Sequence, residues 1–204
     1  MIFVLGGQKR GNIATWNSIA ELQRLTEAKI YVSGYEHWGV LPFEYTWFDT
    51  PTEIVYNIFN DANSWYKHED KYPRYYFQWR HLAHCYNSIT PTSNEIIYKI
   101  RNDYNYSRFP LQDIEPNTIH VPEKEHHASR LFWPDVICND QILGMDKPTA
   151  DKYFDLPNYI PETPDKMLNI PKGRMKLSDI GIEAVLRDYM YHHNINLKTF
   201  FFRY

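Results

Sequence analysis

The sequence predicts a single α/β domain over residues 1–204, with a mostly parallel central sheet flanked by helices. The first observation is a βαβ pattern at the N-terminus: an apolar run at 2–5, a helical pattern, and a second apolar run at 29–32. The second is the run at 96–100, which is β-rich and almost continuously apolar, as is typical of a strand covered on both faces. Because domains cluster at about 100–150 residues, a chain of 204 residues favours one domain over two.

The composition indicates a soluble globular protein without a polyanion-binding surface. Hydrophobic residues make up 43% and charged residues 23% of the chain, which argues against disorder, coiled coils and collagen-like fibres. The net charge of -3 provides no basic field, so we expect no nucleic-acid partner. No apolar window approaches the roughly 18–20 residues of a membrane span, and the N-terminus lacks a signal-peptide pattern, so we expect no membrane span.

The two cysteines predict neither a disulfide framework nor a zinc site. Cys85 and Cys138 lie far apart in the chain and have no CxxC spacing. Such sparse cysteine use suits a reducing compartment, so we expect a cytoplasmic location.

The elements of the N-terminal half follow from apolar spacing. A helix is expected from about residue 15, since Trp16, Ile19 and Ala20 have i, i+3, i+4 spacing. The strand at 29–32 then returns parallel to the strand at 2–5 through a right-handed crossover. Residues 38–51 are aromatic and interrupted by prolines, and 53–65 are consistent with a helix.

The next helix is expected over residues 74–88. Its apolar face consists of Tyr75, Trp79, Leu82, Ala83 and Tyr86. A neighbouring stripe carries Tyr76, Arg80, His84 and Asn87.

The C-terminal part is predicted to add further strands and helices. Short strands are expected at 118–121 and 136–138, with a closing strand at 196–202. Helices are expected at 149–154 and after Ser178, which can cap a helix that continues to about residue 190. The four prolines of 157–171 predict a surface loop over the site.

Polar residues directly follow the strand at 96–100. Asp103 with Asn105 two positions on could hold Mn²⁺ or Mg²⁺ through hard oxygen ligands. This end of the strand is where α/β sheets bind ligands, and Lys99 and Arg101 are basic neighbours. The alternatives are that Asp103 caps the next helix or pairs with Arg101 or Arg108.

Two other segments are candidates for chemistry. Gly6, Gly7, Gln8, Lys9 and Arg10 follow the first strand, where glycines let backbone N–H groups approach phosphate and the basic side chains can meet its oxygens. The alternative for this segment is a tight turn with a solvated basic pair. Asp140 follows the strand expected at 136–138 and could act as a general base, or it could cap the next turn.

Other residue types give no site pattern. The adjacent pairs His126-His127 and His192-His193 cannot chelate one ion from a helix, because neighbouring side chains point about 100° apart. Neither GxSxG nor HExxH occurs. The aromatic content of 17% suits either a cleft that stacks on sugar or base rings or an aromatic-rich core.

In their order along the chain, these segments resemble small GT-A-type glycosyltransferases, particularly the WavE-like lipopolysaccharide-synthesis family and the glycosyltransferase domain of chlorella viruses. The resemblance rests on four short motifs: Gly7-Gln8-Lys9-Arg10, Gln78-Trp79-Arg80-His81, Lys99-Ile100-Arg101-Asn102-Asp103, and Asp140 with Gly144. The third metal-motif position is Asn105 where Asp is usual, which leaves Asp103 as the principal protein ligand of a metal.

The resemblance implies a GT-A (Rossmann-like) fold and a metal-assisted hexosyltransferase of polysaccharide biosynthesis, as found in viruses. It implies a nucleotide-diphosphate sugar as donor, UDP-glucose being the first to test, and a glycan hydroxyl as acceptor. Arg80, together with Lys99 or Arg101, would support the phosphates or the nucleobase, and residues 6–10 would border the nucleotide. Asp103 and Asn105 would hold Mn²⁺ or Mg²⁺, and Asp140 would be the general base.

Two other classes of protein stay open. One is a nucleotide-binding inactive paralogue, and the other is an aromatic-lined glycan-binding module that needs no nucleotide. In each case we expect a monomer or part of a larger multidomain chain.

Overall fold

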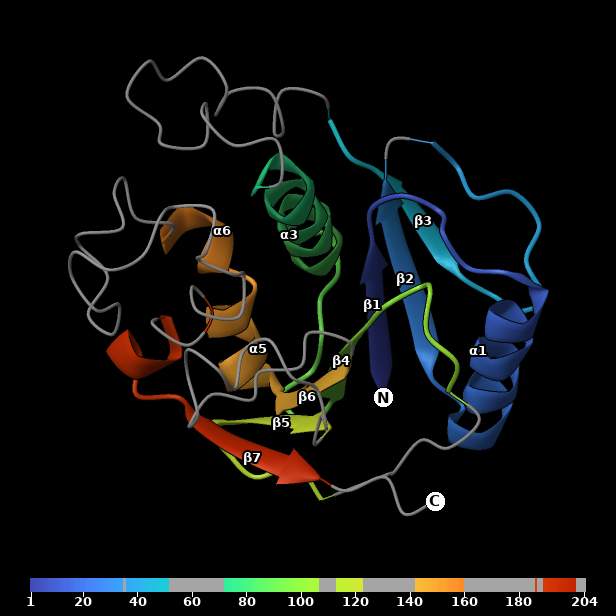
Figure 1. Ribbon diagram of the computed structural model, residues 1–204. Coiled ribbons are helices and arrows are strands. Elements are labelled where there is room, and N and C mark those ends of the chain that lie inside the picture. The colour runs from blue at the N-terminus through green and yellow to red at the C-terminus, as the bar shows by residue number, and fades with distance from the viewer. Residues whose placement is uncertain are drawn as a thin grey trace, which may run out of the picture.

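The computed structural model describes residues 1–34, 36–51, 72–106, 113–122, 142–159, 186 and 189–200. Its seven described strands form one sheet, and helices lie on both faces of that sheet (Figure 1). The strands are β1 (Ile2–Gly6), β2 (Lys29–Gly34), β3 (Thr46–Asp49), β4 (Ile96–Ile100), β5 (Thr118–Pro122), β6 (Ile142–Asp146) and β7 (Asn196–Phe200). The helices are α1 (Ile13–Thr26), α3 (Tyr72–Asn87), α5 (Lys147–Tyr153) and α6 (Leu156–Tyr159).

The predicted βαβ unit is confirmed as β1, α1 and β2. The two strands pair in parallel, with Gly6 opposite Ser33 at their carboxyl ends. α1 begins after Asn12, whose Oδ1 accepts the Thr15 N–H at 3.1 Å, and it ends at Glu27, which adopts a left-handed φ of 51°.

The sheet order is β3-β2-β1-β4-β6-β5-β7. The pairs β2–β3, β1–β2, β1–β4 and β5–β7 are parallel, whereas β6 runs antiparallel to both β4 and β5. The predicted α/β class is therefore confirmed, but the prediction of a mostly parallel sheet is wrong, because the reversed β6 makes the sheet mixed.

β6 was missed because a glycine interrupts its short apolar run. Gly144 lies in mid-strand opposite Tyr98, and a Cβ at this position would lie 2.6 Å from the Tyr98 ring. Gly144, which belongs to the motif that begins at Asp140, therefore makes room for the aromatic core residue Tyr98 of the neighbouring strand.

Each face of the sheet carries its own hydrophobic core. α1 covers one face, where Phe3 and Leu5 of β1 pack with Trp16 and Ile19. α3 and α5 contribute to the opposite core, which includes Ile2 and Val4 of β1. This alternation along β1 is expected for a strand that is buried on both sides.

The helix predicted at 74–88 is confirmed as α3. Trp79, Leu82, Ala83 and Tyr86 are buried as the spacing predicted, and His81 and Cys85 are buried as well. α3 crosses β1 closely, because a Cβ on Gly6 would lie 3.0 Å from the Leu82 backbone nitrogen. Gly6 therefore permits the close contact between α3 and the end of β1.

Most other described elements lie where they were expected. The runs at 96–100 and 118–121 are β4 and most of β5, β7 covers the start of the expected closing strand, and α5 covers most of the helix expected at 149–154. α6 adds a short helix at the start of the expected surface loop. The helix at 53–65, the strand at 136–138 and most of the helix after Ser178 lie outside the described residues.

Among the described residues, no helix is both long and apolar enough to cross a bilayer. Many of the described aromatic side chains are core residues, including Trp16, Trp38 and Trp79. This burial supports the interpretation of the aromatic content as part of the core for these residues.

Candidate functional site

The carboxyl ends of β1 and β4 lie side by side at one edge of the sheet. The chain leaves β1 for β2 on one side, while β4 pairs with β1 on the other. In open α/β sheets, ligands bind at such a switch point, outside the carboxyl ends of the strands. The structure therefore brings two of the predicted segments to one place: Gly6–Arg10 after β1 and Arg101–Asn105 after β4.

A side-chain hydrogen bond and a close backbone approach hold these two segments together. The Asn102 Nδ2 donates to the Gln8 carbonyl oxygen at 2.7 Å, and Asn102 is buried. A Cβ on Gly11 would lie 2.3 Å from the Asn102 carbonyl oxygen, so the segments are in contact at Gly11. Gly7 makes the turn out of β1 with a φ of 94°, and its N–H donates to the Ser33 carbonyl oxygen at 3.0 Å.

Arg101 and Asp103 form a bidentate ion pair at the end of β4. The Arg101 Nε lies 2.8 Å from Asp103 Oδ1, and Nη2 lies 2.7 Å from Oδ2. The hydrogen bonds from Arg101 lower the pKa of Asp103, and the charge of Arg10 contributes in the same direction. The Arg101 and Asp103 side chains are 25% and 26% exposed, so the pair is accessible to a ligand.

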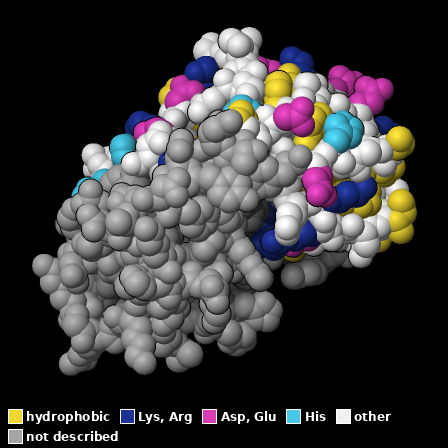
Figure 2. Space-filling view, turned by 90° about the horizontal axis from the view of Figure 1, so that it is seen from above, with side chains coloured by type: hydrophobic (Ala, Val, Ile, Leu, Met, Phe, Trp, Pro, Cys, Tyr) yellow, Lys and Arg dark blue, Asp and Glu magenta, His cyan; other side chains and the backbone are white. Residues whose placement is uncertain are grey.

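The pairing of Asp103 with Arg101 was one alternative that the sequence left open, and the structure confirms it. In this arrangement Asp103 neutralises one cation at an edge that also carries Lys9 and Arg10. Figure 2 shows this end of the molecule, where Lys and Arg side chains gather next to the residues that are not described. Among the described residues at the ends of β1 and β4, the cations Lys9, Arg10 and Arg101 outnumber the single carboxylate of Asp103, which favours an anionic ligand.

Lys9 is held against the aromatic core. Its Nζ donates to the Trp38 carbonyl oxygen at 2.6 Å and lies 5.9 Å from the centroid of the Trp16 ring. Arg10 is exposed, which leaves its guanidinium accessible at the site. Both residues of the predicted basic pair are thus exposed, and Lys9 is in addition anchored through its Nζ.

Two predicted basic residues occupy different surroundings. Lys99 is fully buried in β4, opposite Val4 of β1 and Leu143 of β6. Arg80 lies on α3, and its Nη1 is 3.4 Å from Asn158 Oδ1 of α6. The strand-end segment thus presents Arg101 at its surface, whereas Lys99 lies inside the sheet.

Asp103 and Asn105 offer hard oxygen donors of the kind that Mn²⁺ and Mg²⁺ prefer. Asn105 is exposed two positions after the ionised Asp103. However, both Asp103 oxygens accept hydrogen bonds from Arg101. No cluster of three or more His, Cys, Asp or Glu residues suited to a metal occurs among the described ranges. In the structure, Arg101 therefore occupies the Asp103 carboxylate, which could meet a hard cation only if this ion pair opened.

Asp140, the predicted general base, lies outside the described residues, which resume at Ile142. The described start of β6 at Ile142 pairs with Ile100, the last residue of β4. The chain therefore enters β6 beside the Arg101–Asp103 pair. This register is compatible with the order of motifs on which the resemblance rests.

A buried polar chain behind the β1 turn was missed in the sequence. His81 Nδ1 lies 2.6 Å from Thr50 Oγ1, which in turn lies 2.5 Å from Ser33 Oγ. Burial lowers the pKa of His81 to about 4, and the nearby His84 adds to this effect. The three residues come from α3, the end of β3 and β2, so no local pattern could have revealed them.

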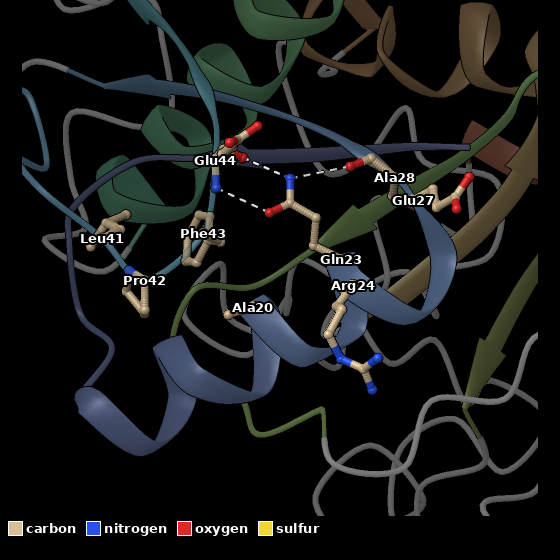
Figure 3. Close-up of a pocket in the computed structure, with 9 residues that line it drawn as sticks. All are labelled: Ala20, Gln23, Arg24, Glu27, Ala28, Leu41, Pro42, Phe43 and Glu44. Carbon is tan, nitrogen blue, oxygen red and sulfur yellow. Dashed lines mark hydrogen bonds between the residues drawn. The ribbon is translucent and has the colours of Figure 1, made fainter.

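Two pockets in the described structure lie elsewhere. The larger, of about 560 Å³, lies between the end of α1 and the loop before β3 (Figure 3). Gln23 connects its walls by donating to the Ala28 and Glu44 carbonyl oxygens and accepting from the Glu44 N–H. A pocket of about 340 Å³ is lined by residues that include Asn87, Asp151 and His193.

Neither pocket contains a residue of the strand-end segments. Convergent charge at the topological switch point is a stronger sign of function than the volume of these open hollows. We therefore take the strand-end edge as the candidate site. No protein-family model, curated protein or solved structure was found to match this chain.

Proposed function

We propose that the protein is a glycosyltransferase that moves a sugar from a nucleotide-diphosphate donor to a hydroxyl group of a glycan. The observation that carries this proposal is the cationic edge where β1 and β4 end side by side. Arg101 and Arg10 lie close enough to influence the same carboxylate, Asp103. Guanidinium groups at a switch point suit the oxygens of a diphosphate.

The topology of the sheet supports a GT-A fold. Its half β3-β2-β1-β4 is parallel and has the strand order of the first half of a Rossmann fold, and β6 alone is reversed among the described strands. The resemblance seen in the sequence uses different information, namely short motifs at the ends of strands. The two lines of support are therefore independent.

In this proposal, residues of the two loops bind the donor. The Gly6-Gly7 turn and Gln8 border the nucleotide, while Arg10 and Arg101 meet the diphosphate oxygens. Arg80 supports the nucleotide from α3. A divalent cation, Mn²⁺ or Mg²⁺, would be held by Asp103 and Asn105, and it would stabilise the charge on the departing nucleotide.

The transfer step requires a base near the acceptor. The acceptor oxygen forms a bond to the anomeric carbon, the bond from that carbon to the diphosphate oxygen breaks, and the nucleotide diphosphate departs with the electron pair. The hydroxyl proton passes to a carboxylate, for which Asp140 is the candidate. The cationic edge at β1 and β4 stabilises the departing anion.

Thermal unfolding with nucleotides tests this function first. UDP, GDP and CMP are added with Mn²⁺ or with EDTA, and a ligand present at 100 times its Kd stabilises a protein by about 2.7 kcal/mol. Release of UDP from UDP-glucose, with and without glycan acceptors, then measures turnover. We expect stabilisation by UDP and acceptor-dependent release, and Asp140→Asn should lower transfer by about 10²–10⁴-fold with donor affinity retained.

Two results would contradict the transferase, and a third would contradict only the role of Asp140. Nucleotide binding without any turnover would indicate a binding module. Stabilisation by oligosaccharides alone would indicate a glycan-binding protein. An Asp140→Asn variant with wild-type transfer would show that Asp140 is a turn residue.

A further inference from the structure

We infer that Arg101 latches Asp103 closed to cations, and that the diphosphate of the donor opens this latch by taking Arg101 for itself. The protein would therefore bind the nucleotide before the divalent cation. This inference rests on the proposed function and specifies the order in which its ligands bind.

The closed state is the ion pair seen in the structure. Arg101 uses Nε and Nη2 to contact both Asp103 oxygens, at 2.8 and 2.7 Å. A cation that approaches these oxygens meets the positive guanidinium at hydrogen-bonding distance from them. Asp103 is consequently a poor site for a free cation while Arg101 remains bound to it.

The backbone beneath the latch is fixed, so opening requires movement of side chains only. Tyr106 Oη accepts from the Arg101 N–H at 2.8 Å and donates to the Arg101 carbonyl oxygen at 2.6 Å. The buried Asn102 side chain points the other way and donates to the Gln8 carbonyl oxygen. The Arg101 side chain is 25% exposed, so a ligand can approach the ion pair from the surface.

A diphosphate is a stronger partner for Arg101 than a single carboxylate. It carries more negative charge, and its oxygens accept bidentate hydrogen bonds from a guanidinium. Arg10 lies near the same pair and adds attraction for the incoming anion. After the exchange, the Asp103 carboxylate and the phosphate oxygens together form an oxygen-rich anionic site for a hard cation.

The coupling between the two ligands can be measured without turnover. Free Mn²⁺ is followed by electron paramagnetic resonance during titration of the full chain, alone and with saturating UDP or UMP. We expect weak binding of Mn²⁺ alone, binding at least tenfold tighter with UDP, and a smaller gain with UMP, which lacks the second phosphate. Binding of Mn²⁺ to UDP in buffer is subtracted.

The decisive variant is Arg101→Gln, with Arg10→Gln as its control for net charge. Removal of the latch should tighten binding of Mn²⁺ alone by roughly tenfold, whereas removal of Arg10 should change it by less than about threefold. Asp103→Asn should abolish the increase in affinity for Mn²⁺, whether it is introduced into the wild-type chain or into Arg101→Gln. Arg101→Lys keeps the charge but loses the bidentate geometry, and it should lie between wild type and Arg101→Gln.

A spectroscopic measurement follows the latch directly. The ¹⁵N-labelled Arg101 Nε–H signal, assigned by its loss in Arg101→Lys, should shift when UDP is added without metal. A fixed signal on saturation with UDP would overturn the latch. The latch would also be overturned if wild type and Arg101→Gln bound Mn²⁺ alone with equal affinity. The same holds if Arg10→Gln increased the affinity for Mn²⁺ alone as much as Arg101→Gln does.

These outcomes separate the inference from the proposed function. If wild type binds UDP and transfers sugar while Arg101→Gln leaves the affinity for Mn²⁺ unchanged, the latch is wrong and the transferase stands. If wild type neither binds UDP nor turns over a nucleotide sugar, the proposed function is wrong and the inference falls with it.

Discussion

The Tyr106 phenol closes the loop after β4 by bonding to both backbone groups of Arg101. Its oxygen accepts from the Arg101 N–H at 2.8 Å and donates to the Arg101 carbonyl oxygen at 2.6 Å. Tyr106 is buried, and its own N–H donates to the Ser18 Oγ of α1 at 2.9 Å. Through its phenol and its backbone N–H, Tyr106 thus fixes the position of Arg101 relative to α1.

Tyr106→Phe should loosen this loop. The substitution leaves the Arg101 N–H and carbonyl oxygen without their phenol partner, at a cost of about 1–3 kcal/mol in the free energy of unfolding. UDP affinity should fall as well, because Arg101 is no longer held in place. Urea unfolding and calorimetric titration measure the two effects, and unchanged values for both would show that the phenol has no such role.

Gly11→Ala should disturb the contact between the two loops. The new Cβ would lie 2.3 Å from the Asn102 carbonyl oxygen and 2.6 Å from the Trp16 ring, so the backbone must shift. We expect a loss of about 1–3 kcal/mol in stability and weaker binding of UDP.

Gly144→Ala is the matched control for this substitution. Its Cβ would lie 2.6 Å from the Tyr98 ring, so it should also destabilise the fold. However, Gly144 lies within the sheet and away from the loops, so binding of UDP should persist in the folded fraction. Equal loss of UDP affinity in both variants would argue against a specific role of Gly11.

Arg80→Ala should weaken UDP binding while the fold is retained. The Arg80 guanidinium makes a long contact of 3.4 Å to Asn158, and loss of a charge-assisted bond to a ligand typically costs about 1.5–3 kcal/mol. Arg24→Ala is the control, since Arg24 pairs with Glu21 on the exposed surface of α1. If calorimetry finds the same UDP affinity in both variants, Arg80 does not contact the nucleotide.

His81 should make the protein less stable in mild acid. Burial lowers its pKa to about 4, below the usual value near 6.5, so the unfolded chain takes up a proton first. The stability that depends on neutral His81 is present above about pH 6.5 and is lost as the pH falls toward 4, by up to roughly 3 kcal/mol.

His81→Gln should flatten the dependence of the free energy of unfolding on pH. His84→Gln should keep most of this dependence, because the His84 ring is only partly buried. Urea unfolding at several values between pH 7 and 4.5 compares the three proteins. An identical slope in wild type and His81→Gln would show that His81 does not titrate on unfolding.

The parts of the fold that were predicted correctly are those with local signals. β4 was recognised as a continuous apolar run, and its charged end carried the site prediction. β3 was missed because Trp47 and Phe48 of this short edge strand are both half-buried, which gives no clear alternation.

The missed parts of the candidate site depend on residues that are distant in sequence. Asn102 meets Gln8 across 94 positions, and His81 meets Thr50 across 31. Arg101, Asn102 and Asp103 lie in the turn after β4, where no regular period applies, so the sequence could suggest neither the direction of the Asn102 side chain nor its partner. Likewise, the sequence alone does not decide between a metal and Arg101 as the partner of Asp103.

Asp103→Asn is expected to remove metal-dependent activity while the fold persists. The amide keeps the shape of the carboxylate but loses the charge that binds Arg101 and a hard cation. Partly exposed ion pairs contribute about 0–1 kcal/mol, so the melting temperature should fall by only a few degrees.

Glu21→Gln is a matched control, because Glu21 accepts the same bidentate arrangement from Arg24, at 2.9 and 2.6 Å, on exposed α1. Both variants lose one carboxylate of a bidentate ion pair, so an effect that they share comes from the loss of such a pair and not from the candidate site. Loss of Mn²⁺-dependent release of UDP only in Asp103→Asn would place the function at the end of β4. Wild-type release from a folded Asp103→Asn protein would show instead that Asp103 serves only to hold Arg101, and that the cation, if the reaction uses one, is bound by other residues.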